Sequence, residues 1–90
     1  MNTILRILRI TPLKEKMGFG SNSTVYAHVG DGVLTPPFKI GLRASGWPEH
    51  EADAINAARM AGKSNDEIRE LVKTLTAKRQ QIANEILSAA

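Results

Sequence analysis

The 90-residue chain has no cysteine, four aromatic side chains and no long apolar run. Without cysteine it cannot form a disulfide framework, which is compatible with a reducing cytoplasm. So few aromatic residues allow one small domain with a thin core, and such chains often need a partner to bury apolar surface. Because Arg6 and Arg9 interrupt the apolar N-terminal stretch, we expect neither a membrane helix nor a secretory signal, and therefore a soluble, cytoplasmic protein.

Side chains suited to catalysis or metal binding are also scarce. His28 and His50 are the only histidines and no cysteine accompanies them, so no metal-ligand cluster is expected. Residues 18–23 have the outline of a phosphate-binding loop, but no lysine follows them and no parallel-sheet pattern surrounds them. We therefore expect no enzymatic activity, no metal site and no cofactor.

Positive charge is unevenly distributed along the chain. Residues 1–47 hold six Lys or Arg against two acids, a net charge of +4, whereas residues 48–90 hold six against seven. A surface that faces phosphates needs such a local excess of cations, although the same excess occurs in proteins that bind nothing anionic. The first half of the chain is thus the candidate nucleic-acid-binding part.

Two short helices separated by a glycine turn are expected in this basic half. Thr11, which precedes a proline, predicts the cap of a helix over residues 12–17, and Ser21 predicts the cap of a helix over residues 21–30. Between them, Gly18 can adopt the left-handed backbone conformation that ends a helix. This arrangement is typical of a helix-turn-helix.

Extended segments are expected on both sides of these helices. Residues 3–10 are rich in branched side chains and fit a strand, while their three-residue period also allows a helical turn. Residues 38–40 alternate apolar, basic and apolar, which predicts another strand. Gly41 would then turn the chain back toward Trp47, so that a small hairpin forms with which the N-terminal strand can pair.

Two further helices are expected after the hairpin. The first would run from Pro48 to Gly62, with acids in its first turns where the helix dipole favours negative charge. Its inner face would comprise Ala52, Ile55, Ala58 and Met60. The second would begin at Ser64, which forms a complete capping box with Glu67, and extend to about Leu87.

The last helix carries an apolar stripe with gaps near the helical period. The stripe comprises Ile68, Leu71, Val72, Leu75, Ile82 and Ile86. Because so long a helix would extend past a small domain, part of this stripe is a candidate oligomerisation surface. The alternative is that the helix folds back on its own domain as an antiparallel hairpin with the helix before it.

An ordered run of short motifs marks residues 10–55: Gly18-Phe19, Ser23-Thr24-Val25-Tyr26, Gly32, Pro37, Lys39-Ile40-Gly41, Arg43, and Gly46-Trp47 followed by Glu51 and Asp53. This run resembles the phage- and prophage-borne AlpA-type regulators, relatives of the excisionases and of the MerR-like winged helix-turn-helix group. The resemblance covers about half of the chain. It implies a mainly α protein with a small β-hairpin: a winged helix-turn-helix DNA-binding domain over residues 1–62 and a long helical extension over residues 63–90.

The second helix and the hairpin supply the residues expected to contact DNA. They are Ser21, Asn22, Ser23, Thr24, Tyr26, His28, Lys39 and Arg43. Asn22 can pair with adenine in the major groove, and the hydroxyl groups can bond to phosphates or bases. Arg43 is the strongest candidate, because the hairpin places it to enter a minor groove or to bind phosphates. Its alternative is a salt bridge to Glu49 or Glu51.

Two of these residues have alternative roles, and the helix lacks one expected feature. Tyr26 can reach a phosphate or pack against the first helix, and His28 can donate to DNA or remain solvated. Related proteins commonly carry Arg or Lys where this helix has Ala27 and Gly30, so the usual guanine reader is missing. With few phosphate contacts, one copy would bind weakly and several copies side by side would be needed.

These observations favour a sequence-specific transcriptional regulator of a phage or mobile element, which binds double-stranded DNA as a homo-oligomer. An excisionase, or recombination directionality factor, that bends DNA for an integrase is the close alternative. In a hypothesis of another class, the C-terminal helix binds a protein such as a polymerase subunit. RNA is a less favoured partner because the sequence predicts no aromatic-bearing sheet.

Overall fold

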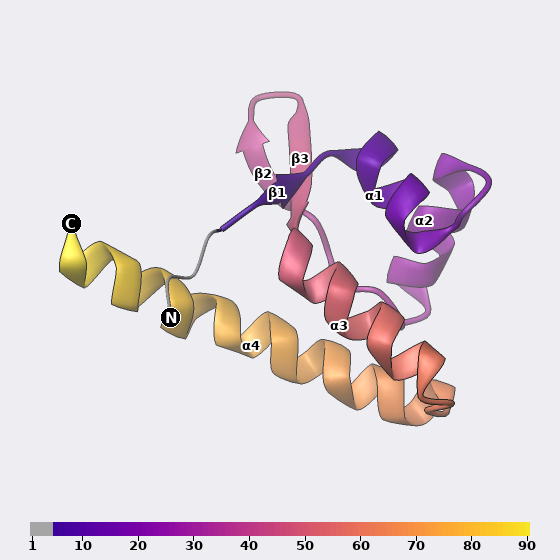
Figure 1. The fold of residues 1–90 in the computed structure, drawn as a ribbon. Helices are drawn as coiled ribbons and strands as arrows, with labels where there is room; N and C mark the ends of the chain where they lie inside the picture. The colour runs from indigo at the N-terminus through magenta and orange to yellow at the C-terminus, as the bar shows by residue number, and fades with distance from the viewer. Residues whose placement is uncertain (1–4) are drawn as a thin grey trace.

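A long C-terminal helix and a small antiparallel sheet frame two short helices and a third of middle length (Figure 1). The computed structural model describes residues 5–90. The elements in chain order are β1 (Ile7–Leu8), α1 (Ile10–Met17), α2 (Asn22–Gly30), β2 (Phe38–Gly41), β3 (Ala44–Pro48), α3 (Glu49–Met60) and α4 (Asn65–Ala89). The prediction of a mainly helical protein with a small β-hairpin and a long C-terminal helix is therefore confirmed.

The N-terminal strand pairs with the hairpin, as predicted. β3 is the central strand of the order β1-β3-β2, and both of its neighbours are antiparallel to it. Ile7 lies opposite Pro48 and Leu8 lies opposite Trp47. The strand is shorter than expected because the chain enters α1 directly after it, and residues 3 and 4 lie outside the described residues.

Gly46 allows the apolar side chains of the sheet to pack closely. A Cβ atom at this position would lie 2.6 Å from a side-chain carbon of Ile7 and 2.6 Å from one of Ile40. At such distances the two isoleucine side chains would have to shift to admit a Cβ atom, so the glycine permits this close packing across the central strand. The residues on either side of Gly46 in the sheet thus make one apolar face.

α1 begins at Ile10, earlier than the sequence predicts. Arg9 precedes the helix with an extended backbone and makes no side-chain capping bond, so the expected cap at Thr11 is wrong. Pro12 instead lies within the first turn, where a missing N–H costs no intrahelical hydrogen bond. At the other end, Gly18 ends the helix in the left-handed conformation, with φ of 73°, as predicted.

One hydrophobic core is shared by residues from all four helices and from β3. Its buried members are Leu13, Val25, Val33, Leu34, Trp47, Ala52, Ile55, Ile68 and Val72. Because Ile68 and Val72 belong to this core, the first half of α4 folds back on its own chain. Their assignment to an oligomer contact is therefore wrong. A boundary at residue 62 would cut through the core, so residues 63–75 are not structurally separate from the domain before them.

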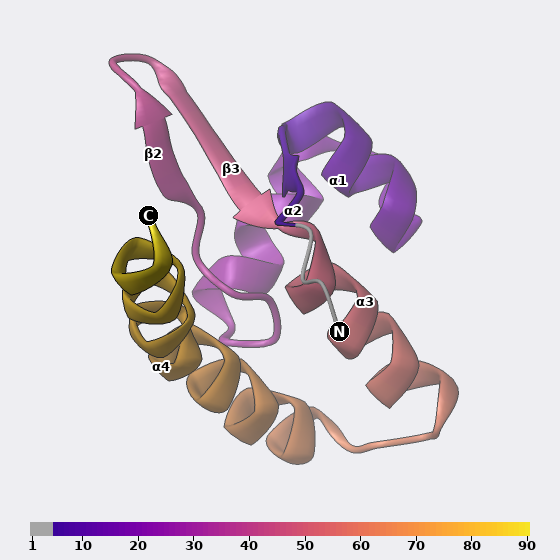
Figure 2. The same ribbon diagram turned by 60° about the vertical axis from the view of Figure 1, so that its left-hand side comes forward.

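The rest of the stripe on α4 is progressively more exposed. Leu71 and Leu75 are partly buried against the core, and Ile82 is half-buried beside the sheet. Ile86, further toward the C-terminus, is 43% exposed. In Figures 1 and 2, α4 starts at the turn after α3, and its second half runs past the root of the hairpin, where it lines a groove together with Phe38 and Pro48.

α3 differs from the prediction at both ends. Pro48 is the N-cap and not the first helical residue, and Met60 is 89% exposed and not part of the inner face. Met60 lies five positions after Ile55, which rotates it by about 140° away from the buried face. Ala52 and Ile55 are buried and Ala58 is partly buried, as expected.

An arginine of α4 connects three parts of the fold. Arg79 donates from Nε and Nη2 to both carboxylate oxygens of Glu51, a fully buried residue of α3. Its Nη2 also donates to the carbonyl oxygen of Pro36 at 2.7 Å, and its guanidinium lies over the ring of Phe38. Arg79 therefore ties α4 to α3 and to the root of the hairpin.

Candidate nucleic-acid interface

The hairpin of β2 and β3 projects from the body of the molecule away from α4 (Figures 1 and 2). Gly41 pairs with Ala44, and Leu42 and Arg43 form the two-residue loop between them. Neither loop residue has a positive φ, so this is not one of the glycine-rich turns that match the twist of paired strands. The pairing register shifts between Lys39 and Gly41 of β2, and such irregularities commonly increase the local twist of a hairpin. The turn predicted at Gly41 is therefore one residue further along.

Two cations of the hairpin are free for an anionic partner. Lys39 and Arg43 are exposed, and neither forms an ion pair with any residue from 5 to 90. The alternative considered for Arg43, a salt bridge to Glu49 or Glu51, does not form, because those two acids pair with cations of other elements. The hairpin thus presents two unneutralised positive charges.

α2 presents a polar surface at its N-terminal end. Asn22, Ser23 and Tyr26 are exposed. The cap predicted at Ser21 is present: its hydroxyl accepts a hydrogen bond from the N–H of Thr24 at 3.2 Å, and the two hydroxyl oxygens lie 3.0 Å apart. Ser21 and Thr24 therefore stabilise the start of the helix, while the three exposed side chains remain available to a partner.

His28 is part of the packing between α2 and the turn before it. Its ring stacks on Phe19 with centroids 4.3 Å apart, and its Nδ1 lies 2.9 Å from the carbonyl oxygen of Thr24. The residue is half-buried, so it is not the solvated histidine that was one alternative. Phe19 is partly buried against the hydrophobic core, and the ring of His28 covers it.

Tyr26 joins α2 to the hairpin. Its ring lies 6.5 Å from that of Trp47 in a tilted arrangement, and it remains 52% exposed. Trp47 is buried, and its Nε1 donates to the carbonyl oxygen of Thr35 at 2.7 Å. Tyr26 therefore lies beside Trp47 of β3, so α2 and the root of the hairpin are neighbours at this point.

Two further cations of the basic half of the chain also lack an acidic partner among residues 5–90. Arg9, exposed between β1 and α1, and Lys14, half-buried on α1, form no ion pair within the described part of the chain. Lys16 is different, because it lies 2.7 Å from Asp53 and 3.2 Å from Glu49. Its hydrogen bond to Asp53 raises the pKa of Lys16 above 10.5.

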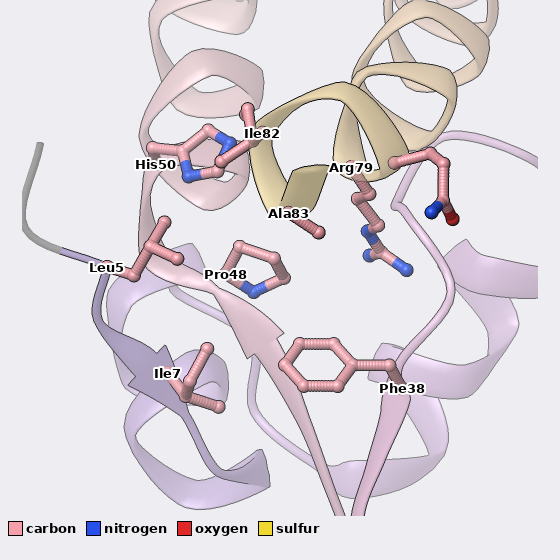
Figure 3. A pocket seen from close by; sticks show the side chains of 9 residues that line it. Leu5, Ile7, Phe38, Pro48, His50, Arg79, Ile82 and Ala83 are labelled. Carbon is pink, nitrogen blue, oxygen red and sulfur yellow. The ribbon is translucent and has the colours of Figure 1, made fainter. Parts of the chain in front are cut away.

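A separate apolar groove of about 400 Å³ lies between the sheet and the second half of α4 (Figure 3). It is lined by Leu5, Ile7, Phe38, Pro48, His50, Arg79, Gln80, Ile82 and Ala83. Of the residues predicted for oligomerisation, Ile82 reaches this groove. None of the residues predicted to contact DNA lines it.

No family model, curated protein or solved structure matches the chain. The resemblance to AlpA-type regulators thus depends on the motif residues alone. Within residues 5–90, no helix is both long and apolar enough to cross a membrane. In the same part of the chain, no three His, Asp or Glu side chains gather where they would hold a metal ion.

Proposed function

We propose that this chain is a sequence-specific binder of double-stranded DNA that regulates transcription, with α1 and α2 as a helix-turn-helix and β2 and β3 as its wing. The observation that supports the proposal best is the packing of Tyr26 on Trp47. It keeps the polar end of α2 beside a hairpin whose Lys39 and Arg43 have no acidic partner in residues 5–90. A DNA duplex offers base edges to the polar end of α2 and phosphates to the cations of the hairpin.

In this proposal α2 enters the major groove. Asn22 would form two hydrogen bonds with adenine, Ser23 would bond to a phosphate or base edge, and the Tyr26 hydroxyl would reach a phosphate. The wing would lie along the neighbouring minor groove, where Arg43 and Lys39 meet a strongly negative potential. His28 would act indirectly, since its ring holds Phe19 in place.

The number of contacts limits the affinity of one copy. The second half of α2 has Ala27 and Gly30 and so no side chain for the bidentate recognition of guanine. We therefore propose that several copies bind side by side on one operator, so that each copy adds to the affinity of the next. Because Ile68 and Val72 lie in the core, a contact between copies would have to use other surfaces, such as the groove beside Ile82.

Selection of bound fragments from random duplex DNA, followed by mobility shifts on the selected sequence, tests this function. Arg43→Ala and Lys39→Ala should each weaken binding about tenfold, because each removes a charged contact to DNA. Arg59→Ala and Lys78→Ala are matched controls, since both residues are exposed and lack an ion pair in the described structure. The controls should bind within about twofold of the wild type.

These experiments distinguish a DNA-binding regulator from a protein that acts by binding another protein. Selection that enriches no sequence, with no shift of any duplex by the folded protein, would overturn the proposal in favour of a protein partner. Equal weakening by the wing variants and their controls would show that binding depends on net charge alone. In cells, a change in promoter output without an integrase would identify a transcriptional regulator, whereas excised circular DNA in an integrase-bearing host would identify a directionality factor.

A further inference from the structure

The tip of the hairpin carries an apolar side chain that nothing in the described chain covers. Leu42 is 92% exposed, the highest value among the large apolar residues of residues 5–90. Two-residue loops most often hold glycine, asparagine or aspartate, which suit both the turn and the solvent. A leucine in this loop therefore leaves apolar surface in water where a polar residue would serve the fold equally well.

The surroundings of Leu42 indicate what it would contact. It is followed directly by Arg43, and Lys39 lies three positions before it on β2, both without an acidic partner in the described part of the chain. Leu42 and Ile40, which is 49% exposed on β2, together cover far less than the ~1,000 Å² that a stable protein interface needs. An apolar side chain between cations suits a duplex, in which stacked bases lie between two rows of phosphates.

The base of the hairpin is anchored to the rest of the fold, so a side chain at its tip can press on a bound partner without the hairpin moving away. On β3, Trp47 is buried and hydrogen-bonded, and Gly46 packs under Ile40. On β2, Phe38 lies under the guanidinium of Arg79. Both strands are thus tied to the core, while the tip extends freely on the side away from α4 (Figure 2).

We propose that Leu42 is a wedge that enters the minor groove of the bound duplex and partly unstacks one base step, so that the DNA kinks at the wing. The inference depends on the proposed DNA binding and adds a mechanical action to it. Insertion of an apolar side chain between bases bends DNA toward the major groove in other minor-groove binders. Flexible TA or CA/TG steps should therefore be enriched under the wing, because they unstack most readily.

The test compares bend and affinity on the selected duplex. The bend is measured by fluorescence energy transfer between the duplex ends, and unstacking by a 2-aminopurine placed at each step under the wing. With wild-type protein, the ends should approach and one 2-aminopurine should brighten. With Leu42→Ala, the energy-transfer change and the 2-aminopurine brightening should both disappear. Affinity should fall by less than about tenfold, because the variant loses the contact of Leu42 with the bases but no longer has to unstack them. Leu42→Met should retain them.

Three results would overturn the wedge, and they differ from failure of the proposed function. A duplex that stays straight with wild-type protein bound, or that bends equally with Leu42→Ala, removes the wedge while DNA binding stands. A bend lost with Arg43→Ala but kept with Leu42→Ala would assign bending to charge neutralisation. Absence of binding to any duplex would remove both proposals. Because Leu42 contributes nothing to the core, circular dichroism of Leu42→Ala should match the wild type.

Discussion

Arg79 and Glu51 are 28 positions apart in the chain and form a two-point ion pair, with Nε to Oε2 at 2.8 Å and Nη2 to Oε1 at 2.7 Å. The Glu51 side chain is 0% exposed, whereas that of Arg79 is 21% exposed. A buried carboxylate is tolerated only while it is paired, because its desolvation is otherwise uncompensated. The pair therefore makes the position of α4 a condition for the stability of α3.

Arg79→Ala should lower the free energy of unfolding by about 3–5 kcal/mol, since it leaves the Glu51 carboxylate buried without a partner. Urea denaturation followed by circular dichroism measures the change. Lys73→Ala is the control, because the Lys73–Glu70 pair is exposed on both sides and should change stability by less than about 1 kcal/mol. Equal effects of the two variants would contradict a structural role for the buried pair.

The parts of the fold that follow local rules could be predicted from the sequence. Ser64 and Glu67 cap α4 as expected, with hydrogen bonds in both directions, and Gly18 ends α1 in the left-handed conformation. The partner of Glu51 could not be predicted, because the rules for first-turn acids and for apolar stripes both treat each helix alone. In the sequence Arg79 is one polar residue among the apolar positions of the last helix, whereas in the fold it hydrogen-bonds both Glu51 and Pro36.

The sequence predicted which elements carry the candidate site residues, but not which of the cations are paired with acids. Sequence rules place Asn22, Ser23 and Arg43 on the right elements, because helix caps and strand alternation decide which side chains face out. They cannot show that Lys16 is neutralised by acids of α3 while Arg9 is not. They also cannot show that a ring such as His28 finds an aromatic neighbour across a turn.

Gly46→Ala should destabilise the protein by about 1–3 kcal/mol, because the new methyl group would overlap the side chains of Ile7 and Ile40. Chemical denaturation gives the value. Gly20→Ala is the matched control, since no atom lies within 4 Å of its Cβ position and its φ is not positive. A fully stable Gly46→Ala protein would mean that β1 does not pack against β3 as described.

Trp47→Phe should lower the free energy of unfolding by about 1–3 kcal/mol, because the buried carbonyl oxygen of Thr35 loses its donor. Trp47 is the single tryptophan, so the wild-type unfolding curve can be followed by its fluorescence. Its emission should be that of a buried indole and should shift to the red on unfolding. Red emission from the native protein would contradict the packing of Tyr26 and Trp47.

The stability of the start of α4 should depend on pH in the acid range. The backbone N–H of Ser64 hydrogen-bonds the carboxylate of Glu67 and, with the Ser64 side chain, lowers its pKa below 4.5. A lowered folded-state pKa means that the unfolded chain binds more protons, so stability rises with pH through this range. The stability that the Glu67 carboxylate contributes is fully present above pH 4.5, its unfolded-state pKa. It is lost as the pH falls through the lower pKa of the folded state.

Glu67→Gln isolates this contribution, because it keeps the side-chain length but does not titrate. Urea midpoints measured from pH 2 to 7 should rise more steeply for the wild type than for Glu67→Gln. Glu85→Gln controls for the loss of one negative charge from the same helix. Parallel curves for the wild type and Glu67→Gln would show that the capping box contributes nothing that depends on protonation.

Salt dependence of DNA binding should distinguish the cations that are free from those that are paired. Arg9 is exposed and forms no ion pair in the described structure, so in the proposed complex it would bind a phosphate beside the wing. Lys16 is held by Asp53 and Glu49, and it would have to leave both to reach DNA. Each phosphate contact contributes about 0.9 to the slope of log affinity against log salt concentration.

Arg9→Ala should therefore reduce this slope by about 1 and weaken binding uniformly across sequences, whereas Lys16→Ala should leave the slope unchanged. Fluorescence anisotropy of a labelled duplex at several salt concentrations measures both. An unchanged slope for Arg9→Ala would place the duplex away from the start of α1. A reduced slope for Lys16→Ala would mean that α1 exchanges its acidic partners on α3 for phosphates when DNA binds, since a cation that stayed paired could release no counterion.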